Sequence, residues 1–450
     1  MNSTVHTLWR GKTFSEVGLA VIDGDRGTEY PQDSDFSNDN FCLFLSAKNV
    51  TKDGFRFNEC QFIDKDKHNK LRKGLLSRGD IVLTTRGTVG NIAFFDDFVS
   101  YEVIRINSGM VIIRNEGGNI LSQYLYSVLR SSIFSEQTRQ QAFGSAQPQL
   151  TVGIINKFLL PVPPLPQQKK IAKILTNVDK LIENTQALIE KYTAIKQGMM
   201  ADLFTRGIDL SGTPETNPNH GQLRPVYEDA PELYKETELG WVPKEWEIQT
   251  IEALSVGGFK NGYFKDPKLL GEGIKLVNVS DLYQDFGIDI RPDKVERIKV
   301  SSKDFNKYSV AVGDIFFTRS SLVLEGIAKS NIVRYLPEQA VFECHVMRLR
   351  PNVDLVSPDY LALYCETDNS RKYLMSMAKQ VTMTTIAQPD MVGLLVPVPC
   401  LNEQYLFVAK YNALNNLVQK EVVEMKKYMA IKKGLMQDLL TGKVRVTVAQ

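Results

Sequence analysis

Side chains that could do chemistry are few and far apart in this chain of 450 residues. The sequence contains no GxxxxGK(S/T) phosphate loop, no GxGxxG turn after a strand, no HExxH pair and none of the Asn-Pro-Pro-aromatic pattern that amino-methyltransferases use. Glu343 and His345 flank Cys344, but an ExH triplet without further ligands is more typical of a plain strand than of a metal site. We therefore expect no catalytic residue and no metal site in the chain.

Two loops place an arginine among hydroxyl side chains after a strand that begins Gly-Asp-Ile. They read TTRGTVGN (residues 84–91) and TRSSLVLEG (residues 318–326). Such a loop can donate hydrogen bonds to phosphate oxygens, and its arginine can bind guanine edges in the major groove. A solvated loop would have the same composition. The recurrence in both halves raises DNA contact to an equal alternative, and both interpretations stay open. The candidates in these loops are Thr85, Arg86, Thr88, Thr318, Arg319 and Ser320, and weaker candidates elsewhere are Lys48, Asn49, Gln147, Gln149, Asn278 and Gln388.

The chain carries an internal repeat that determines how these loops are positioned. YTAIKQGMMADLFT (192–205) returns as YMAIKKGLMQDLLT (428–441), with nine identities in fourteen positions at a shift of 236 residues. Unrelated segments would share roughly one position. The Pro-Val-Pro of 161–163 returns at 397–399, Gly-Asp-Ile returns at a shift of 234, and Ala-Gln-Pro (146–148) returns at a shift of 241. A duplication is therefore indicated, in which each half has a variable body followed by a well-kept tail.

Composition sets the class of protein. The 43% apolar and 24% charged content is typical of a soluble globular protein, and no run of about eighteen apolar residues or signal-type start is present, so we expect a cytoplasmic protein without a membrane span. The five cysteines are scattered and never spaced as CxxC, which argues against a disulfide frame or a zinc site. With 54 basic and 52 acidic residues, any surface for nucleic acid must be local.

The tails have the periodicity of long helices. In the first, nine positions from 171 to 199 follow alternating steps of three and four, with Thr185 as the only polar member of the seam. Roughly forty residues make a helix about 60 Å long. In the second tail three seam positions become charged, and Val418, Val422 and Met425 offer a neighbouring apolar stripe. Two such helices in one chain can cover each other by packing side by side. We favour the antiparallel direction, while the parallel one stays open.

An apolar stripe by itself predicts only an intramolecular bundle. The repeated helix ends, however, keep lysine, glycine and aspartate, which are poor residues for a core. Their repetition favours a surface presented twice to identical partners. The candidate partner-binding residues are Tyr192, Lys196, Gly198, Asp202, Tyr428, Lys432, Gly434 and Asp438.

The bodies read as α+β modules. Segments 41–50, 79–95 and 108–114 are β-rich and precede a predicted helix at 121–129, and the second body has counterparts at 274–282, 313–329, 345–350 and 360–364. Between the two repeats, residues 207–243 are rich in Gly, Pro, Asn and acids and have no apolar periodicity. This segment is predicted to be an extended connector.

The variable body, the Pro-Val-Pro turn, the long helix that ends in YxAIKxGxMxDLxT and the doubling of this unit together resemble the specificity subunit of Type I restriction-modification enzymes. The resemblance spans nearly the whole chain, including TRGIDLSG (205–212), ETELGWVPKEWE (236–247) and the two Ala-Gln-Pro sites. It implies an α+β fold with two similar target recognition domains of mixed sheet and short helices. Two long helices would join them as an antiparallel coiled coil with an internal pseudo-twofold repeat. The expected boundaries are 1–165 and 241–400 for the recognition domains, 166–206 and 401–442 for the helices, and 207–240 for the linker.

The resemblance also implies function and partners. Each recognition domain would read one half of a bipartite, asymmetric site on double-stranded DNA, while the helices set the gap and dock two copies of the modification subunit. Methylation and cleavage would reside in the modification and restriction/translocase subunits, so S-adenosylmethionine, ATP and Mg are expected there and no cofactor in this chain. Two alternatives stay open: a self-contained DNA methyltransferase or nuclease, and a coiled-coil adaptor that does not bind DNA. The charged seam residues Glu421 and Glu424 depart from a regular coiled coil.

Overall fold

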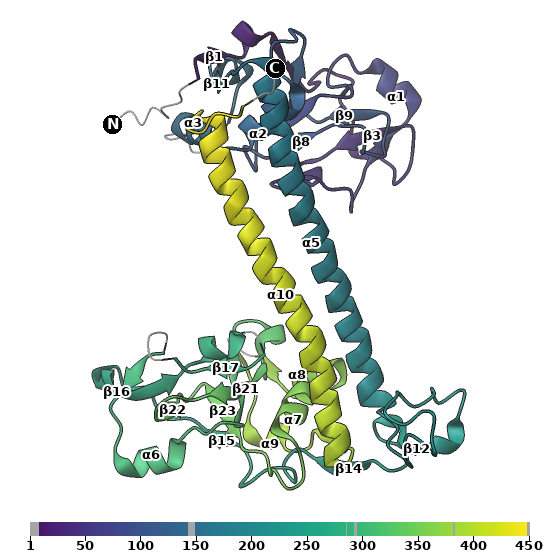
Figure 1. Cartoon of the computed structure of the whole chain (residues 1–450), viewed down its shortest axis with the longest axis vertical. Coiled ribbons are helices and arrows are strands. Elements are labelled where there is room, and N and C mark those ends of the chain that lie inside the picture. The colour runs from purple at the N-terminus through teal and green to yellow at the C-terminus, as the bar shows by residue number, and fades with distance from the viewer. Residues whose placement is uncertain (1–8, 143–148, 285, 292–294, 381–382, 448–450) are drawn as a thin grey trace. The chain divides into compact units, whose positions relative to one another are not determined.

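The computed structural model describes residues 9–142, 149–284, 286–291, 295–380 and 383–447. The chain divides into two compact units. Unit 1 comprises Met1–Ala187 and Glu421–Gln450, and unit 2 comprises Leu188–Lys420. Each unit therefore holds one variable body, half of the first long helix and half of the second (Figure 1).

The body of unit 1 is built on an antiparallel four-stranded sheet in the order β2-β10-β7-β8. A second sheet, β6-β3-β9, pairs β3 with β9 in parallel. The short pairs β1-β11 and β4-β5 are antiparallel. The strand bounds are β1 Gly11–Thr13, β2 Leu19–Asp23, β3 Cys42–Leu45, β4 Val50–Thr51, β5 Gly54–Phe55, β6 Phe62–Ile63, β7 Ile81–Thr84, β8 Ile92–Phe94, β9 Ile104–Ile106, β10 Met110–Asn115 and β11 Leu159–Pro161. The helices of this body are α1 Lys65–Lys70, α2 Ser122–Leu129, α3 Ser132–Ala142 and α4 Val152–Ile155.

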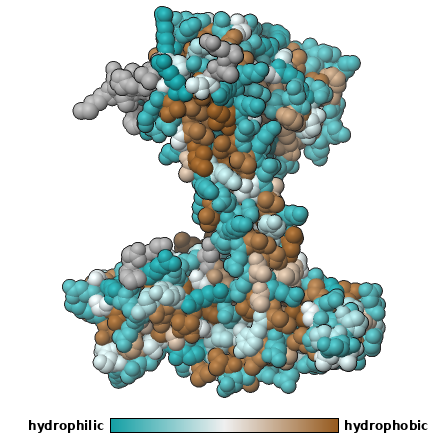
Figure 2. All heavy atoms as spheres, in the orientation of Figure 1, coloured by the Kyte–Doolittle hydropathy of each residue, from teal (hydrophilic) through white to brown (hydrophobic). Residues whose placement is uncertain are grey.

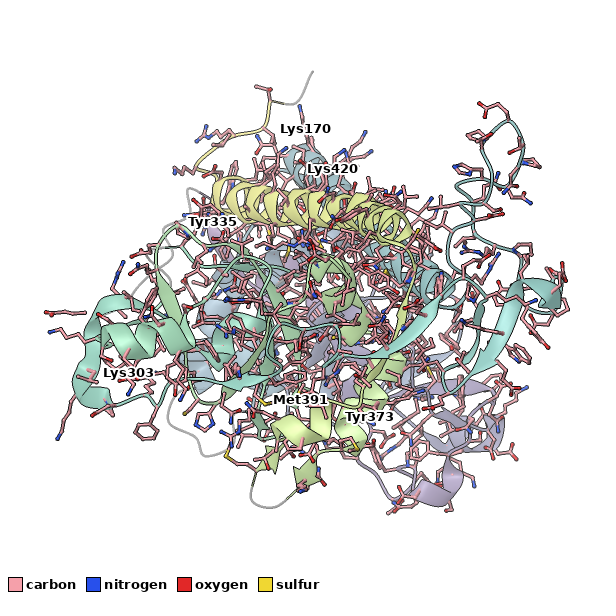
Figure 3. The ribbon with its side chains drawn as sticks, turned by 90° about the horizontal axis from the view of Figure 1, so that it is seen from below. Lys170, Lys303, Tyr335, Tyr373, Met391 and Lys420 are labelled. Carbon is pink, nitrogen blue, oxygen red and sulfur yellow. The ribbon has the colours of Figure 1, made fainter. Side chains whose placement is uncertain are left out.

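The body of unit 2 repeats this plan. Its largest sheet has the order β15-β23-β19-β21-β17, a second sheet, β18-β16-β22, again has a parallel pair, and β20-β25-β24 forms a third. The strand bounds are β14 Glu247–Thr250, β15 Lys260–Asn261, β16 Leu270–Val277, β17 Ile288–Asp289, β18 Arg297–Ile298, β19 Ile315–Thr318, β20 Ser320–Ser321, β21 Ser330–Tyr335, β22 Ala340–Phe342, β23 Val346–Leu349, β24 Lys379–Gln380, β25 Thr384–Thr385 and β26 Leu395–Val398. The helices are α6 Ser302–Tyr308, α7 Pro358–Cys365, α8 Asp368–Ser376 and α9 Gln388–Met391. Lys303 of α6 points outward from this body (Figure 3).

Both bodies make the same buried hydrogen bond to the strand that precedes their long helix. The hydroxyl of Tyr124 donates to the carbonyl of Pro161, and the hydroxyl of Tyr360 donates to that of Pro397, at 3.0 and 2.7 Å. Each body also ends in a strand that pairs with its first strand, β1 with β11 and β14 with β26. These repeated contacts confirm the internal repeat at the level of single hydrogen bonds.

A buried glutamine near the start of each long helix makes a further matched contact. Gln168 accepts from the Leu121 backbone N–H at 2.8 Å and donates to the Pro163 carbonyl at 2.8 Å. Gln404 accepts from Ser357 at 2.7 Å and donates to the carbonyl of Pro399, also at 2.8 Å. Both side chains are fully buried, where an unpaired amide would be costly. The two hydrogen bonds of each glutamine therefore fix the orientation of that body on its helix.

The long helices, α5 (Leu165–Thr205) and α10 (Leu401–Leu440), pack antiparallel. In unit 1 the early part of α5 lies beside the late part of α10, where Lys432 forms an ion pair with Asp179 (Figure 1). In unit 2 the late part of α5 lies beside the early part of α10, where the ammonium of Lys196 donates to Asn415 at 2.9 Å. The two contacts correspond to each other under the 236-residue shift. The α+β class and the antiparallel direction are thus confirmed.

The predicted seam of α5 is only half buried. Thr185 is 6% exposed, whereas Leu181, Leu188 and Ile195 are 44%, 37% and 44% exposed. The helix pair therefore covers one row of the seam and leaves the other row on the surface. The expectation that the two helices satisfy each other's stripes is wrong for this second row, because the stripe that α10 buries is shifted from its own regular seam, with Val418 buried and Leu417 exposed.

Helix α10 rotates its buried stripe as the sequence suggested. Val418 is 7% exposed, while the regular seam position Leu417 is 41% exposed. The charged seam residues Glu421 and Glu424 lie half-buried at the rim, and Glu424 contacts Lys427. Exposed apolar side chains thus remain on α10 as well, including Ile431 at 42%. Figure 2 shows apolar side chains gathered over the helix pair of unit 1.

The connector after α5 carries its own structure in unit 2. It includes the hairpin of β12 (Tyr234–Thr237) and β13 (Gly240–Pro243), so the prediction of a purely extended segment is wrong at this point. A pattern search misses this hairpin because β12 is mostly polar and β13 contains Gly and Pro. The stacking of Tyr227 on Trp241, with ring centroids 4.2 Å apart, contributes to its packing. In the described part of the chain, no helix combines the length and apolar character needed to cross a bilayer.

One buried carboxylate contacts residues at the start of the connector, within it and just after it. Glu403 of α10 accepts from the Ile208 backbone N–H at 2.6 Å, from Arg224 at 2.7 Å and from the Trp246 indole at 3.1 Å. Gly207 has a φ of 67°, and a Cβ there would lie 2.3 Å from the Glu403 carboxylate. Only glycine fits both the backbone conformation and the space. Glu403 therefore fastens both ends of the connector to the start of α10.

Candidate nucleic-acid interface

The first arginine loop follows β7 on the surface of unit 1. Arg86, Gly87 and Thr88 are exposed, and Gly87 has a φ of 67° in an open turn. With the amide oxygen of Gln149 turned toward Arg86, that oxygen accepts from Nε at 3.0 Å and from Nη2 at 2.9 Å. The guanidinium is therefore held in place while its remaining N–H groups stay exposed. A held arginine of this kind suits a bidentate contact to a guanine edge.

Thr85 has a structural role in the same loop. It is 2% exposed, its backbone N–H donates to the Gly109 carbonyl at 2.8 Å, and its hydroxyl donates to the same carbonyl at 2.9 Å. A side chain used in this way cannot reach DNA. Gln147 lies outside the described residues, so only Gln149 of the two glutamines has a known position.

The second loop follows β19 in unit 2. Thr318 is buried, and its hydroxyl donates to the Gly326 carbonyl at 2.6 Å, so it too is structural. Arg319 is half-buried, and its guanidinium donates to the Cys344 carbonyl at 3.4 Å. Ser320 lies beside it in β20, with its hydroxyl 3.3 Å from Nδ1 of His345. Arg319, Ser320 and His345 thus form one polar surface group.

The two arginines do not occupy corresponding positions. The backbone N–H of Arg319 donates to the His345 carbonyl, and in unit 1 the equivalent donor to Gly109 is Thr85. Arg86 corresponds to Ser320, one residue further along. The idea that both arginines stand at the same place is therefore wrong, because the shift of 234 that aligns Gly-Asp-Ile also aligns Thr85 with Arg319.

The Ala-Gln-Pro sites do not correspond either. The Leu150 backbone N–H donates to Thr85 at 3.1 Å, and the Ile386 N–H donates to Arg319 at 3.1 Å, which sets a shift of 236 rather than 241. Gln388 therefore begins α9, and its amide donates to the Phe259 carbonyl at 3.0 Å. This contact uses the side chain inside the body rather than on a reading surface.

The weaker candidates from the sequence serve mainly the fold. Asn49 is 1% exposed, accepts from Ser46 at 2.9 Å and donates to backbone carbonyls. Asn278 accepts from Lys265 and donates to the Leu276 carbonyl. Lys48 is exposed and pairs with Glu59 at 2.7 Å, and this hydrogen bond raises the pKa of the Lys48 ammonium. Lys48 is therefore the most exposed of these three side chains, since Asn278 is half-buried and Asn49 is buried.

The candidate partner-binding residues divide into paired and open positions. Lys196 and Lys432 are used between the helices, and Asp202 and Asp438 pair with nearby basic side chains. Tyr192 and Tyr428 are half-buried. Gly198 and Gly434, in contrast, are exposed, and an added Cβ at either would meet nothing within 4 Å.

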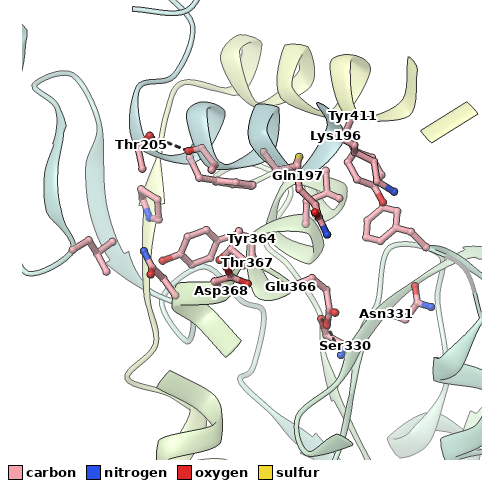
Figure 4. A pocket seen from close by; sticks show the side chains of 18 of the residues that line it. Lys196, Gln197, Thr205, Ser330, Asn331, Tyr364, Glu366, Thr367, Asp368 and Tyr411 are labelled. Carbon is pink, nitrogen blue, oxygen red and sulfur yellow. Dashed lines mark hydrogen bonds between the residues drawn. The ribbon is translucent and has the colours of Figure 1, made fainter. Parts of the chain in front are cut away.

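A recess of about 720 Å³ lies inside unit 2 between the end of α5, the β12–β13 hairpin and the body. Lys196, Gln197 and Thr205 lie along its α5 side, and Tyr364, Glu366 and Asp368 along its body side (Figure 4). Glu366 is held there by Lys329 and by the Ser330 hydroxyl, which donates to it at 2.7 Å. The repeated helix end thus borders a cavity of mixed polar and aromatic character.

Sequence reasoning missed several residues that fix this arrangement. The buried glutamines Gln168 and Gln404 were identical under the 236-residue shift and could have been found from the repeat. Glu403 has no carboxylate counterpart, since position 167 is glutamine, so the repeat gives no signal for it. His345 was considered only as a metal ligand, although its carbonyl orders the Arg319 loop.

Comparison with known proteins finds similarity to one family. Residues 12–193 match the family model of the Type I restriction modification DNA specificity domain. The chain is 27% identical over 350 residues to the Type I restriction enzyme MjaVIII specificity subunit of Methanocaldococcus jannaschii, covering 76% of this chain and 74% of that protein. It is 19% identical over 418 residues to the EcoKI specificity subunit of Escherichia coli, covering 92% and 80%.

The fold also matches a solved structure. The crystal structure of the Type-I restriction-modification system S subunit from M. genitalium aligns over 98% of both chains with a TM-score of 0.56 and 13% sequence identity. This likeness covers both bodies and both long helices. The family model and the relatives show that the chain is similar to the specificity subunits of Type I restriction-modification enzymes, and residues 12–193 match the DNA specificity domain of that family.

Proposed function

We propose that the chain reads a bipartite DNA site for a Type I complex. Each body reads one half of the site, the helix pair sets the gap, and two copies of the modification subunit dock on the helices. The observation that carries this proposal is the matched pair of contacts Lys432–Asp179 and Lys196–Asn415. Each contact lies within one unit and joins a repeated lysine of one long helix to the other helix, with the roles of α5 and α10 exchanged between the units. Such an internal repeat is expected of a protein that presents two readers to the two strands of DNA.

The bodies differ where the helices agree, which supports an asymmetric site. Arg86 stands one position beyond the place that Arg319 occupies in the second body, and each has different polar neighbours. Two readers with different donors at different positions select different base sequences. The chain would therefore bind its site in one orientation only.

The exposed apolar row supports docking of partners on the helices. Leu181, Leu188 and Ile195 recur every seven residues along α5 at solvent-exposed seam positions. On α10, Leu417 and Ile431 occupy two of the three matching positions, and Glu424 occupies the third. A helical partner laid against such a row completes the seam. Repetition of the row on both helices fits two copies of one partner.

Chemistry is assigned to the partners in this proposal. The modification subunits would supply methylation with S-adenosylmethionine, and the restriction/translocase subunits would supply ATP- and Mg-dependent translocation and cleavage. This chain would contribute recognition and geometry alone. Incubation of the purified chain with DNA and the methyl donor should transfer no methyl group, whereas the chain with its modification subunits should methylate one defined site. Methyl transfer by the chain alone would overturn this division of labour.

The two arginines should govern separate halves of the site. We expect Arg86→Ala to lower discrimination in one half-site by about 1–3 kcal/mol and Arg319→Ala to do so in the other, because each guanidinium would contact base edges. Competition binding with DNA libraries randomised in one half measures this loss. Lys48→Ala is a matched control, since Lys48 is exposed but paired with Glu59. A uniform loss across all sequences would identify Arg86 and Arg319 as phosphate contacts.

Substitutions at the two exposed glycines should affect stability and partner binding in opposite directions. Gly198→Ala and Gly434→Ala should each raise the free energy of unfolding by up to about 1 kcal/mol, because alanine is the better helix former and its Cβ meets nothing in this chain. Each should weaken binding of one modification subunit, since the methyl group lies on the proposed docking face. Denaturant unfolding and titration of the subunit measure the two effects. Docking that is unchanged in both variants would place the partner elsewhere.

A further inference from the structure

The turn between β22 and β23 in unit 2 gathers three metal-binding side chains. The sequence suggested a plain strand here, but Cys344 and His345 form the centre of a turn that the Val346 backbone N–H closes by donating to the Glu343 carbonyl at 3.0 Å. One ligand atom from each of Glu343, Cys344 and His345 lies within 4.8 Å of the others. Tetrahedral zinc bonds of about 2.0–2.3 Å place ligands about 3.5 Å apart, so small side-chain rotations close the site.

Glu343 gives independent evidence for a cation. Its side chain is 8% exposed, and its carboxylate accepts from the Val279 backbone N–H at 3.1 Å. Among the residues that the structure describes, no lysine, arginine or histidine forms an ion pair with it. The pKa of nearby Asp281 is raised by burial and also by the charges of Glu296 and Glu343, so the surroundings are acidic. Buried carboxylates are normally paired with a cation or bound to a metal.

The neighbouring groups suit a metal-bound histidine. Ser320 Oγ lies 3.3 Å from Nδ1 of His345. A proton on Nδ1 donated to this hydroxyl leaves Nε2 with a free lone pair, which is the usual outer-shell arrangement of a ligating histidine. A thiolate, an imidazole and a carboxylate form a zinc-type ligand set, whereas magnesium and calcium prefer oxygen ligands alone.

We propose that Glu343, Cys344 and His345 bind a zinc ion that fixes the turn beneath Arg319. Two carbonyls of this turn accept from Arg319, that of His345 from its backbone N–H at 2.8 Å and that of Cys344 from its guanidinium at 3.4 Å. The thiolate and carboxylate charges cancel the charge of the ion, so Arg319 faces a neutral centre. The effect of the metal on DNA reading rests on the proposed function, but its binding does not.

Unit 1 contains a natural reference for this site. Its corresponding turn is closed by the Met110 backbone N–H, which donates to the Asn107 carbonyl. The positions of Glu343, Cys344 and His345 are taken there by Asn107, Ser108 and Gly109. None of these three residues offers a thiolate, an imidazole or a carboxylate. The same fold thus forms the turn once with the ligand set and once without it.

Cobalt(II) titration of the full chain in the absence of DNA tests the proposal. We expect one cobalt ion per chain with a thiolate-to-cobalt absorption band, and displacement of cobalt by zinc. Cys344→Ser should abolish the band, and Glu343→Gln, which keeps the acceptor for Val279, should weaken binding at least tenfold. Cys60→Ser, which changes another half-buried thiol, should leave the band unchanged.

Hydrogen exchange tests whether a bound metal orders the turn beneath Arg319. Zinc should slow exchange of the Arg319 and Val346 amides in the wild type and leave the Thr85 and Met110 amides of unit 1 unchanged. The same comparison in Glu343→Gln should show a much smaller slowing, and thermal unfolding shows whether that variant is folded. The proposal would be overturned by any of three results. These are the absence of the cobalt band, a band that persists in Cys344→Ser, and a rate of amide exchange at Arg319 that zinc does not change.

Discussion

Inserting four residues into α5 after Leu181 should abolish binding to the original DNA site or move the chain to a site with a longer gap. Four residues add about 6 Å of helix, which is close to two base pairs. The insertion also separates the contact between Lys196 and Asn415 from the contact between Lys432 and Asp179, because only one helix is lengthened. We therefore expect the affinity for the original site to fall at least a hundredfold, as measured by binding to DNA with gaps of varied length.

A matched insertion in α10 sharpens this test. The two contacts place Leu181 opposite Ala430, so four residues added after both positions restore the antiparallel register. The double insertion should recover affinity on sites whose gap is about two base pairs longer, while the single insertion should not. Full affinity of either protein for the original gap would contradict the idea that helix length sets the spacing.

Replacing Glu403 by alanine should cost about 3–5 kcal/mol in the free energy of unfolding of unit 2. The substitution leaves the guanidinium of Arg224, which is 6% exposed, without its buried counter-charge, and it removes the acceptor for Ile208 and Trp246. Unfolding in guanidinium chloride, followed by tryptophan fluorescence, measures the effect, since Trp246 reports directly on this cluster. The connector should also become more sensitive to proteases.

Two controls make the Glu403 prediction specific. Glu421→Ala changes a half-buried carboxylate on the same helix and should alter stability by less than about 0.5 kcal/mol. Gln167→Ala changes the corresponding position in unit 1, where the amide oxygen has no hydrogen-bond partner among the described residues, and should cost far less than Glu403→Ala. A Glu403→Ala protein within about 1 kcal/mol of the wild type would show that the cluster does not hold the connector.

The repeat made much of the fold predictable. Identity between 192–205 and 428–441 indicated two equivalent helices, and the strands after each Gly-Asp-Ile lie where β propensity placed them. Periodicity could not show which row of the α5 seam would be buried, since Leu181 and Thr185 belong to the same heptad pattern. That choice depends on which stripe the partner helix presents, and the periodicity of one helix does not give this.

The candidate site was less predictable than the fold. Thr85, Thr318 and Asn49 have residue types that bind DNA, yet their side chains are used for turns inside the bodies. Polar residues in loops bind their own backbone as readily as a ligand, so composition cannot separate the two uses. The one-residue offset between Arg86 and Arg319 was present in the sequence, but only the backbone bonds of Thr85 and Arg319 fixed the alignment.

The pairing of first and last strands has a consequence for how such chains diversify. Because β1 joins β11 and β14 joins β26, the first and last strands of each body form one two-stranded stem immediately before its long helix. Loops and whole strands beyond that stem can be lengthened, shortened or exchanged as a cassette while the stem keeps its shape. If each body reads one half of the DNA site, as proposed, one recombination event can replace one half of the target sequence and retain the other half unaltered.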